Sequence, residues 1–244
     1  HFIARKQQRR SARFCSHYVN RKFARFTKRN RVMKSTFSML KGAPLLPIIQ
    51  PKSVDEGLHL AEAIANSGLC NIEVVKRSDA AFEALSAIRK QFPELVVGMG
   101  TLLNRNHVFE ALDAGAQFLI TPTSSETLLD TLIASNAPFL PGVATPADIL
   151  LAHQKGIREM KFFPASLSGG TPFLKAISSV FSDVCFCPTG GINGDNANEY
   201  LSLGNVRAVG GTWMMPKAAI EAKNWQAITL ACQQSLTLFD EAAA

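Results

Sequence analysis

No apolar run in this sequence approaches the roughly 20 residues that a membrane-spanning helix requires. Its cysteines are odd in number and form no C-x-x-C pair, and its five histidines show no spacing typical of a metal site. We therefore expect a reduced, cytoplasmic protein that does not enter the membrane and holds no metal ion. With 244 residues and 47% hydrophobic content, the chain is long enough for one large domain.

Acidic residues are also absent from the first 34 positions, which carry twelve of the 26 Lys and Arg residues. The other 210 residues hold 14 basic and 19 acidic side chains, so the net charge of +7 comes from this arm alone. The arm lacks the apolar core of a secretory signal. We predict a basic, leader-like arm over residues 1–35, disordered or non-native, followed by one folded domain over residues 36–244.

The origin of the arm has three interpretations. The chain starts at His1, and Met33 and Met39 stand where the composition becomes globular, which favours a translated leader ahead of an internal start. An organellar presequence is the second interpretation. A nucleic-acid-binding tail is the third, because no folded nucleic-acid-binding module follows the arm.

From Ala43 onward, short apolar runs alternate with longer amphipathic stretches, a pattern typical of parallel strands joined by helices. Eight such units can be counted, and a last helical region is expected over residues 217–239. The expected strands are residues 45–49, 71–75, 95–98, 118–121, 139–141, 160–163, 184–187 and 206–209. Eight strand–helix units in one domain predict a (β/α)8 TIM barrel.

Glycine or proline follows most of these strands, at the ends where barrel enzymes keep their catalytic groups. Gly-Gly pairs at 190–191 and 210–211 come after the seventh and eighth strands, where barrels commonly bind phosphate through backbone N–H groups. These two turns predict an anion site, with tight turns alone as the alternative. A doubly wound open sheet is the alternative fold, but a dinucleotide-binding fold would place its glycines after the first strand.

Two charged residues stand inside apolar strands. Lys161 lies in Met-Lys-Phe-Phe, and Glu73 lies in Asn-Ile-Glu-Val-Val. Apolar surroundings favour the neutral amine of a lysine, which can attack a carbonyl to form a Schiff base. Because they belong to the second and sixth strands, both side chains can point into one interior cavity. The alternatives are a lysine that reaches solvent and a purely structural ion pair.

Arg77 and Thr101 follow the second and third expected strands. A guanidinium matches a carboxylate in a bidentate way, so the two residues are candidates for holding a substrate carboxylate. The alternative for Arg77 is a solvated loop arginine.

Seven short motifs occur in order along the domain. They are I-E-V at 72–74, G-M-G-T at 98–101, G-A-Q-F at 115–118, P-G-V-A-T at 141–145, K-F-F-P-A at 161–165, C-P-T-G-G-I at 187–192 and G-G-T-W at 210–213. Together they resemble the bacterial class I aldolases for 2-keto-3-deoxy-6-phosphogluconate (KDPG) and 4-hydroxy-2-oxoglutarate (KHG). The resemblance extends from about residue 38 to the C-terminal helix and leaves out the basic arm.

The resemblance implies a Schiff-base aldolase that splits KDPG into pyruvate and D-glyceraldehyde 3-phosphate, and also KHG into pyruvate and glyoxylate. It implies one (β/α)8 barrel preceded by a short N-terminal helix, usually in a homotrimer, with no metal or cofactor. In its terms Lys161 would form the Schiff base, and Glu73 would shuttle protons for carbinolamine formation and C–C cleavage.

The same resemblance implies how the substrate, a phosphorylated keto acid, would bind. Arg77 and Thr101 would hold the pyruvate carboxylate, and Pro122 and Phe163 would line the pocket. The implied phosphate ligands are Gly190, Gly191, Gly210, Gly211 and Thr212.

Five positions depart from the pattern of the family. They are Gln50, Val75, Lys76, Thr123 and Ser166. None of them removes a catalytic group. Val75, Lys76 and Ser166 motivate a second hypothesis, that the barrel binds a phosphorylated ligand but is impaired in catalysis.

Overall fold

The computed structural model describes residues 33–40 and 44–240 of the chain. Most of the predicted basic arm, residues 1–32, lies outside the described residues. None of the helices in the described part is long and apolar enough to cross a membrane.

Short strands alternate with helices along the described chain. The strands are β1 (Leu45–Ile49), β2 (Asn71–Val75), β3 (Val96–Gly100), β4 (Leu119–Ile120), β5 (Phe139–Leu140), β6 (Gly142–Val143), β7 (Glu159–Phe162), β8 (Cys185–Pro188) and β9 (Val209–Gly211). The helices are α2 (Val54–Ser67), α3 (Ala81–Gln91), α4 (Arg105–Asp113), α5 (Glu126–Ser135), α6 (Pro146–Gln154), α7 (Gly170–Ser178), α8 (Ala197–Leu201), α9 (Lys217–Glu221) and α10 (Trp225–Asp240), with a 3-10 turn, η1, at Ser166–Ser168.

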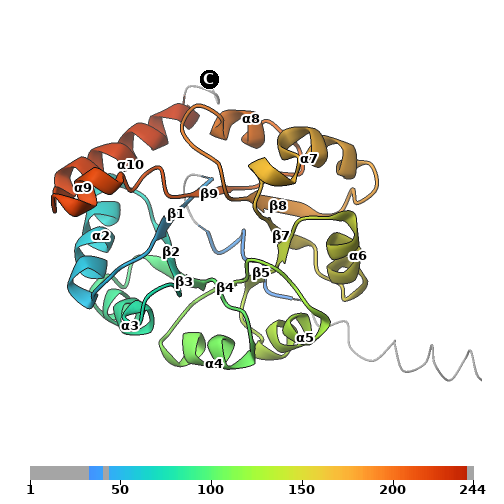
Figure 1. Ribbon diagram of the computed structural model, residues 1–244, viewed down its shortest axis with the longest axis horizontal. Helices are drawn as coiled ribbons and strands as arrows, with labels where there is room; N and C mark the ends of the chain where they lie inside the picture. Colours follow the sequence, from blue (N-terminus) through green and yellow to red (C-terminus); the bar gives the residue numbers. More distant parts are fainter. Residues whose placement is uncertain (1–32, 41–43, 241–244) are drawn as a thin grey trace, which may run out of the picture. The chain divides into compact units, whose positions relative to one another are not determined.

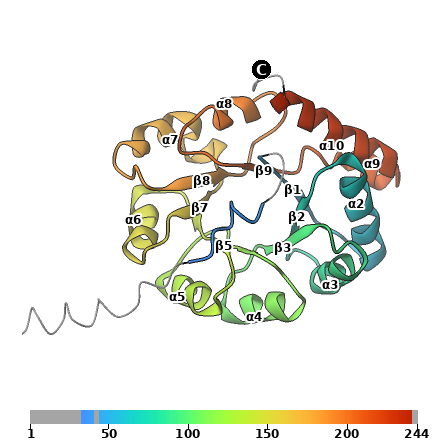
Figure 2. The ribbon, with the colours of Figure 1, turned by 180° about the vertical axis from the view of Figure 1, so that it is seen from behind.

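All strand pairings in the described chain are parallel. β5, β4, β3, β2, β1 and β9 form one sheet in that order, and β6, β7 and β8 form a second. Single-residue bridges join Phe186 to Val206 and Thr189 to Gly210, which connects β8 to the β9 region. The strands curl around a common centre and the helices lie outside them (Figures 1 and 2). The α/β class and the parallel order of the strands are therefore confirmed.

Pro141 divides one predicted strand into two. The sequence predicts a single strand over residues 139–141, whereas β5 ends before Pro141 and β6 begins after it. Proline has no N–H to donate to a neighbouring strand. Its carbonyl still accepts a hydrogen bond of 2.9 Å from the Lys161 N–H, so the chain passes from the β4 side to the β7 side at this residue.

The other strands agree with prediction to within three residues. β1 and β2 have the predicted bounds, and β9 begins at Val209 rather than at residue 206. The predicted final helical region is two helices, α9 and α10, because Lys223 between them adopts a positive φ of 51°. The short helix expected before the first strand is not found within residues 33–40, which form a turn: the Thr36 carbonyl accepts the N–H groups of Met39 and Leu40.

Local caps fix where several helices begin. Ser53 Oγ accepts the Glu56 N–H at 3.1 Å at the start of α2. At the start of α6 the Thr145 hydroxyl accepts the Asp148 N–H, and the Asp148 carboxylate accepts the Thr145 N–H. Pro146 is the first residue of this helix. These side chains replace the hydrogen bonds that the first turn of a helix lacks.

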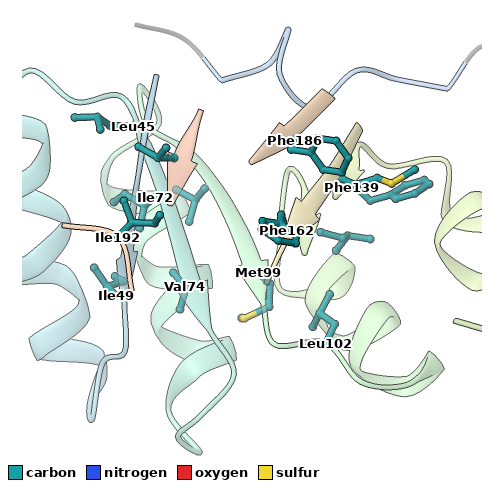
Figure 3. Packing of buried hydrophobic residues seen from close by; sticks show 14 of the residues in the cluster. Leu45, Ile49, Ile72, Val74, Met99, Leu102, Phe139, Phe162, Phe186 and Ile192 are labelled. Atoms are coloured by element: carbon teal, nitrogen blue, oxygen red, sulfur yellow. The ribbon is translucent and has the colours of Figure 1, made fainter. Parts of the chain in front are cut away.

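Most of the apolar core lies between the strands and the helices (Figure 3). Ile72, Val74, Met99, Phe162 and Phe186 belong to this outer layer and are fully buried. Each buried side chain of this size stabilises the fold by about 1.5–3 kcal/mol. Helices and strands are held together mainly by this layer.

A smaller cluster lies on the face of the strands that points away from the helices. Successive residues of a strand point to opposite faces, so the residues that alternate with the outer layer point inward. The inner cluster consists of Leu46, Val96, Phe118, Ile120, Leu140, Cys187 and Ala208.

Residues 33–40, called the N-terminal segment below, cover this inner cluster. Phe37, Met39 and Leu40 pack against it. The segment, drawn in blue, lies among the strands in both ribbon views (Figures 1 and 2). Ser35, which the sequence assigns to the basic arm, donates a hydrogen bond of 2.5 Å to Glu159 at the start of β7.

Replacing Phe118 by alanine should remove a main contact of the inner cluster. Its ring is fully buried and lies against Gly98, where an added Cβ would be 2.2 Å from it. Phe118→Ala should lower the free energy of unfolding in urea by about 3–5 kcal/mol. Phe109 is 41% exposed on α4, so Phe109→Ala should change the stability by only about 0.5 kcal/mol. Equal losses in both variants would contradict this assignment.

Candidate active site

Lys161 and Glu73 meet in the interior of the fold. Lys161 comes from β7 and Glu73 from β2, and the Lys161 Nζ lies 3.0 Å from Glu73 Oε1 and 3.4 Å from Oε2. Glu73 is 0% exposed and Lys161 is 5% exposed. The structure therefore brings together the two charged residues that the sequence singles out. The alternative of a lysine that reaches solvent is wrong.

This ion pair is buried and its members depend on each other. Removing either partner would leave an uncompensated buried charge, a loss of about 3–5 kcal/mol. At 3.0 Å the two groups are also within the distance at which a proton can pass between them. Such a transfer leaves a neutral amine, which is the form of lysine that attacks a carbonyl.

Gly100 makes space for the Glu73 carboxylate. A Cβ at Gly100 would lie 1.9 Å from Glu73 Oε1, closer than any real contact. Val75, two residues after Glu73, pairs with Gly100 in the β2–β3 register and is buried. The second glycine of the G-M-G-T motif, Gly100, is therefore required by the close approach of the Glu73 side chain.

Cys187 is a neighbour of the pair that the sequence analysis does not place in the site. It lies opposite Lys161 in the β7–β8 register and is 1% exposed. Burial raises the pKa of the Cys187 thiol to about 12, although the Lys161 charge lowers it and the Glu73 charge raises it. The thiol is therefore neutral at physiological pH. Cys187 occupies an inward-facing position of β8, two residues before Thr189. This position is the sequence signal that could have placed the thiol near Lys161.

The two predicted carboxylate ligands differ in their positions. Thr101 directly follows β3, is half-buried and has a positive φ of 61°, which a β-branched residue rarely adopts. Such strain is typical of functional sites. Arg77 is exposed, and within the described residues its side chain forms no hydrogen bond or ion pair. Thr101 is thus fixed beside Gly100, whereas Arg77 lies on the rim.

Lys76 points away from the ion pair. Its Nζ lies 5.7 Å from the centre of the Phe82 ring on α3. Burial lowers the pKa of His107 at the start of α4, and the charge of Lys76 lowers it further. Lys76 therefore lies beside the surrounding helices, on the opposite face of β2 from Glu73.

Phe163 connects the lysine to the first glycine pair. The Lys161 Nζ lies 5.5 Å from the centre of the Phe163 ring. The same ring is 3.2 Å from the position that a Cβ at Gly190 would take. Pro122 follows β4, and its backbone carbonyl carbon would be 2.2 Å from a Cβ at Gly142, the strand partner of Lys161. The residues predicted to line the pocket are both half-buried.

The first glycine pair forms a turn. Gly190 and Gly191 follow β8 with φ values of 95° and 76°, which glycine adopts without strain. Ser166, one of the departures from the family pattern, lies against this turn: its Oγ would be 2.0 Å from a Cβ at Gly191.

The second glycine pair is not a turn, and the expectation of two glycine turns is wrong in this respect. Gly210 and Gly211 are the last residues of β9. They pair with Leu46 and Pro47 of β1. A Cβ at Gly210 would lie 2.6 Å from Thr189 Oγ1, so close packing of β8 against β9 requires this glycine. Thr212, just after β9, is exposed.

No group of three or more His, Cys, Asp or Glu side chains in the described part of the chain could hold a metal ion. The residues placed near Lys161 are an amine, a carboxylate, an apolar wall and glycine-rich strand ends.

Comparison with known proteins identifies the family. The model of the KDPG and KHG aldolases matches residues 37–231. The chain belongs to this family. The KHG/KDPG aldolase of Escherichia coli K12 is 39% identical over 202 residues, which cover 83% of this chain and 95% of its relative. The 2-dehydro-3-deoxy-phosphogluconate aldolase of Pseudomonas aeruginosa is 38% identical over 204 residues, covering 84% and 93%.

Solved structures of aldolases from this family share the fold. The KDPG aldolase of Legionella pneumophila, captured with pyruvate as a covalent carbinolamine intermediate, matches with a TM-score of 0.80 at 39% identity, covering 83% of this chain and 98% of that one. The enzyme of Zymomonas mobilis ZM4 with 3-phosphoglycerate matches with a TM-score of 0.78 at 35% identity, covering 85% and 97%.

Gly100→Ala should disrupt the candidate site although it replaces no charged residue. The added methyl group must displace the Glu73 carboxylate from Lys161, so the free energy of unfolding should fall by about 3 kcal/mol, as for a broken buried ion pair. Gly204→Ala is the matched control, because a Cβ there meets nothing within 4 Å. Urea denaturation measures both, and a Gly100→Ala variant as stable as Gly204→Ala would contradict the close packing.

Proposed function

We propose that the chain is a class I aldolase that cleaves KDPG into pyruvate and D-glyceraldehyde 3-phosphate through a Schiff base on Lys161. The same site would cleave KHG into pyruvate and glyoxylate. The observation that carries the proposal is the buried Lys161 amine 3.0 Å from the Glu73 carboxylate. Membership of the aldolase family and the carbinolamine captured in the Legionella pneumophila relative support it.

The Schiff base forms in two steps. Glu73 takes a proton from Lys161, and the free amine attacks C2 of the keto acid to give a carbinolamine. Glu73 then returns a proton to the C2 hydroxyl, which leaves as water and yields a protonated imine. Because both carboxylate oxygens lie within 3.4 Å of Nζ, Glu73 can exchange protons at this position without moving far.

Cleavage uses the protonated imine as an electron sink. A base, for which Glu73 is the candidate, removes the proton of the C4 hydroxyl, the C3–C4 bond breaks, and its electrons move into the imine to form an enamine. The C4 fragment leaves as the aldehyde. Protonation at C3 and hydrolysis then release pyruvate and restore Lys161. The lysine itself supplies the electrophile, so this sequence of steps requires no cofactor.

The remaining site residues would bind the ends of the substrate. Thr101 and Arg77 would hold the pyruvate carboxylate, with the exposed Arg77 side chain closing over it from the rim. Pro122 and Phe163 would form the apolar wall beside the imine. This assignment is supported by the half-buried Thr101 next to β3 and by the Phe163 ring 5.5 Å from Nζ.

The strand ends of β8 and β9 would bind the phosphate of KDPG. Gly190 and Gly191 offer backbone N–H groups in a turn with positive φ, and such turns form concave anion sites. Gly210, Gly211 and Thr212 would supply the other side. The Thr189–Gly210 bridge supports this arrangement because it joins the two strand ends directly.

We also propose that the two sheets close into one (β/α)8 barrel. The passage of the chain through Pro141, between β5 and β6, and the bridges between β8 and the β9 region support closure at both junctions. The homotrimer, the cytoplasmic location and the division into a basic arm and a barrel remain proposals that the family resemblance and the charge distribution support.

Treatment with pyruvate and borohydride should modify Lys161. Borohydride reduces the imine, so the peptide that contains Lys161 should gain the mass of one reduced pyruvate. Lys161→Ala should abolish this labelling and lower kcat/KM for KDPG cleavage at least about a thousandfold. Mass spectrometry of the digested protein and a pyruvate-release assay measure the two effects.

Lys175 provides the control for this experiment, since it is exposed on α7 and outside the site. Lys175→Ala should be labelled and active like the unchanged protein. Label on another lysine, or activity that survives in Lys161→Ala, would refute the proposed function. Saturable binding of KDPG without cleavage would favour the impaired barrel instead.

Glu73→Gln should separate catalysis from binding. The amide keeps the shape of the side chain but cannot accept a proton, so kcat should fall by about 10²–10⁴-fold, the usual contribution of a general acid–base group. The affinity for pyruvate should change much less, as measured by titration of the variant. A kcat equal to that of the unchanged protein would remove Glu73 from the mechanism.

A further inference from the structure

Glu159 anchors the start of β7 to the N-terminal segment. Its carboxylate accepts hydrogen bonds from Ser35 Oγ at 2.5 Å, from the Thr36 N–H at 2.7 Å and from the Phe37 N–H at 3.1 Å. Glu159 is the first residue of β7, and its three donors lie more than 120 residues away in the sequence. Hydrogen bonds to a charged acceptor are about twice as strong as those between neutral groups.

The N-terminal segment is well fixed on its other side. Thr36 is 0% exposed, and Phe37, Met39 and Leu40 pack on the inner cluster. That cluster includes Cys187, the β8 partner of Lys161. A continuous series of contacts therefore runs from the segment to the strand neighbour of the lysine.

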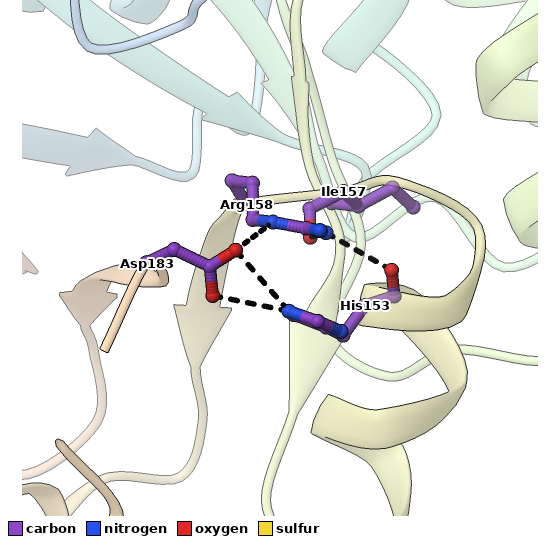
Figure 4. Close-up of polar contacts among 4 residues, drawn as sticks. All are labelled: His153, Ile157, Arg158 and Asp183. Atoms are coloured by element: carbon purple, nitrogen blue, oxygen red, sulfur yellow. Dashed lines mark hydrogen bonds and ion pairs between the residues drawn. The ribbon is translucent and has the colours of Figure 1, made fainter. Parts of the chain in front are cut away.

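The outer side of the same strand start is held by a different cluster (Figure 4). Arg158 Nε donates to Asp183 Oδ2 at 2.5 Å, and its Nη1 donates to the carbonyls of His153 and Ile157. His153 Nε2 lies 3.0 Å from Asp183 Oδ1. Burial alone would raise the pKa of Asp183, but the hydrogen bonds from His153 and Arg158 bring it below its usual value. This cluster links α6, the residue before β7 and the loop before β8, and its Arg158 and Asp183 side chains are partly exposed.

We propose that Glu159 is a positioning residue for Lys161, an inference that rests on the proposed function. The two residues are two positions apart on β7, so their side chains lie on the same inward face with Cα atoms about 7 Å apart. A shift at the start of β7 therefore moves Nζ relative to Glu73 on the opposite side of the interior. Because a misplacement of about 1 Å can reduce a rate about a hundredfold, the anchor matters for turnover as well as for stability.

Glu159→Gln tests the proposal in the full chain. The amide keeps one acceptor oxygen but loses the charge and the second acceptor, so the strand start should loosen. We expect kcat for KDPG cleavage to fall about tenfold, as for a displacement well below 1 Å, while KM changes less than about threefold. The single-turnover rate of borohydride trapping with pyruvate should fall with kcat. Ser35→Ala removes one of the three donors and should lower kcat by a smaller factor of about three.

Asp183→Asn is the matched control, because it weakens the outer cluster at the same strand start. It should lower the melting temperature while kcat stays within about twofold of the unchanged protein, as expected of a surface pair. If Glu159→Gln lowers the melting temperature but leaves kcat unchanged, or if Asp183→Asn lowers kcat as much, Glu159 is merely structural. If Glu159→Gln does not fold, the kcat of Ser35→Ala decides, and no change there overturns the proposal.

The same measurements separate this inference from the proposed function. An unchanged protein that neither cleaves KDPG nor is trapped on Lys161 would overturn both. An active unchanged protein with an unaffected Glu159→Gln variant would overturn the positioning role alone.

Discussion

A lysine and a glutamate buried 3.0 Å apart determine what the rest of this structure must provide. Such a pair contributes little stability on its own, because the loss of hydration offsets the attraction between the charges. The stability must come from elsewhere, and the apolar layer between strands and helices supplies it. The pair also needs space and neutral surroundings. Gly100 gives the carboxylate room, and the Cys187 thiol beside Lys161 carries no charge at physiological pH.

Along strand β7, the residue that anchors the strand and the residue that meets Glu73 lie at different positions. Its first residue, Glu159, bonds to the N-terminal segment, and its inward-facing Lys161 meets Glu73. Phe163, two residues further and just past the strand, lies between the lysine and Gly190. Glu159 therefore lies at the start of β7, whereas Lys161 and Phe163 lie towards and just past its end.

The sequence predicts the order of the elements and the pair at the centre, but not the contacts that depend on packing. β1 and β2 have the predicted bounds because each is a short apolar run between polar residues. The predicted bounds of β9 are too early in the chain, because the sequence analysis interprets Gly210 and Gly211 as a turn. In the structure they belong to β9, and Gly210 must be glycine because Thr189 lies close to it. The link from Ser35 to Glu159 spans 124 residues, and no local pattern indicates it.

Strand alternation also decides which departures from the family pattern concern the substrate. Val75 and Lys76 are adjacent in sequence but lie on opposite faces of the chain at the end of β2. Val75 faces the interior beside Gly100, where it adds an apolar surface next to Glu73. Lys76 places its charge over Phe82, among the helices. Of these departures, Val75 therefore lies beside Gly100 and Ser166 beside Gly191, next to the candidate site, whereas the Lys76 side chain contacts Phe82.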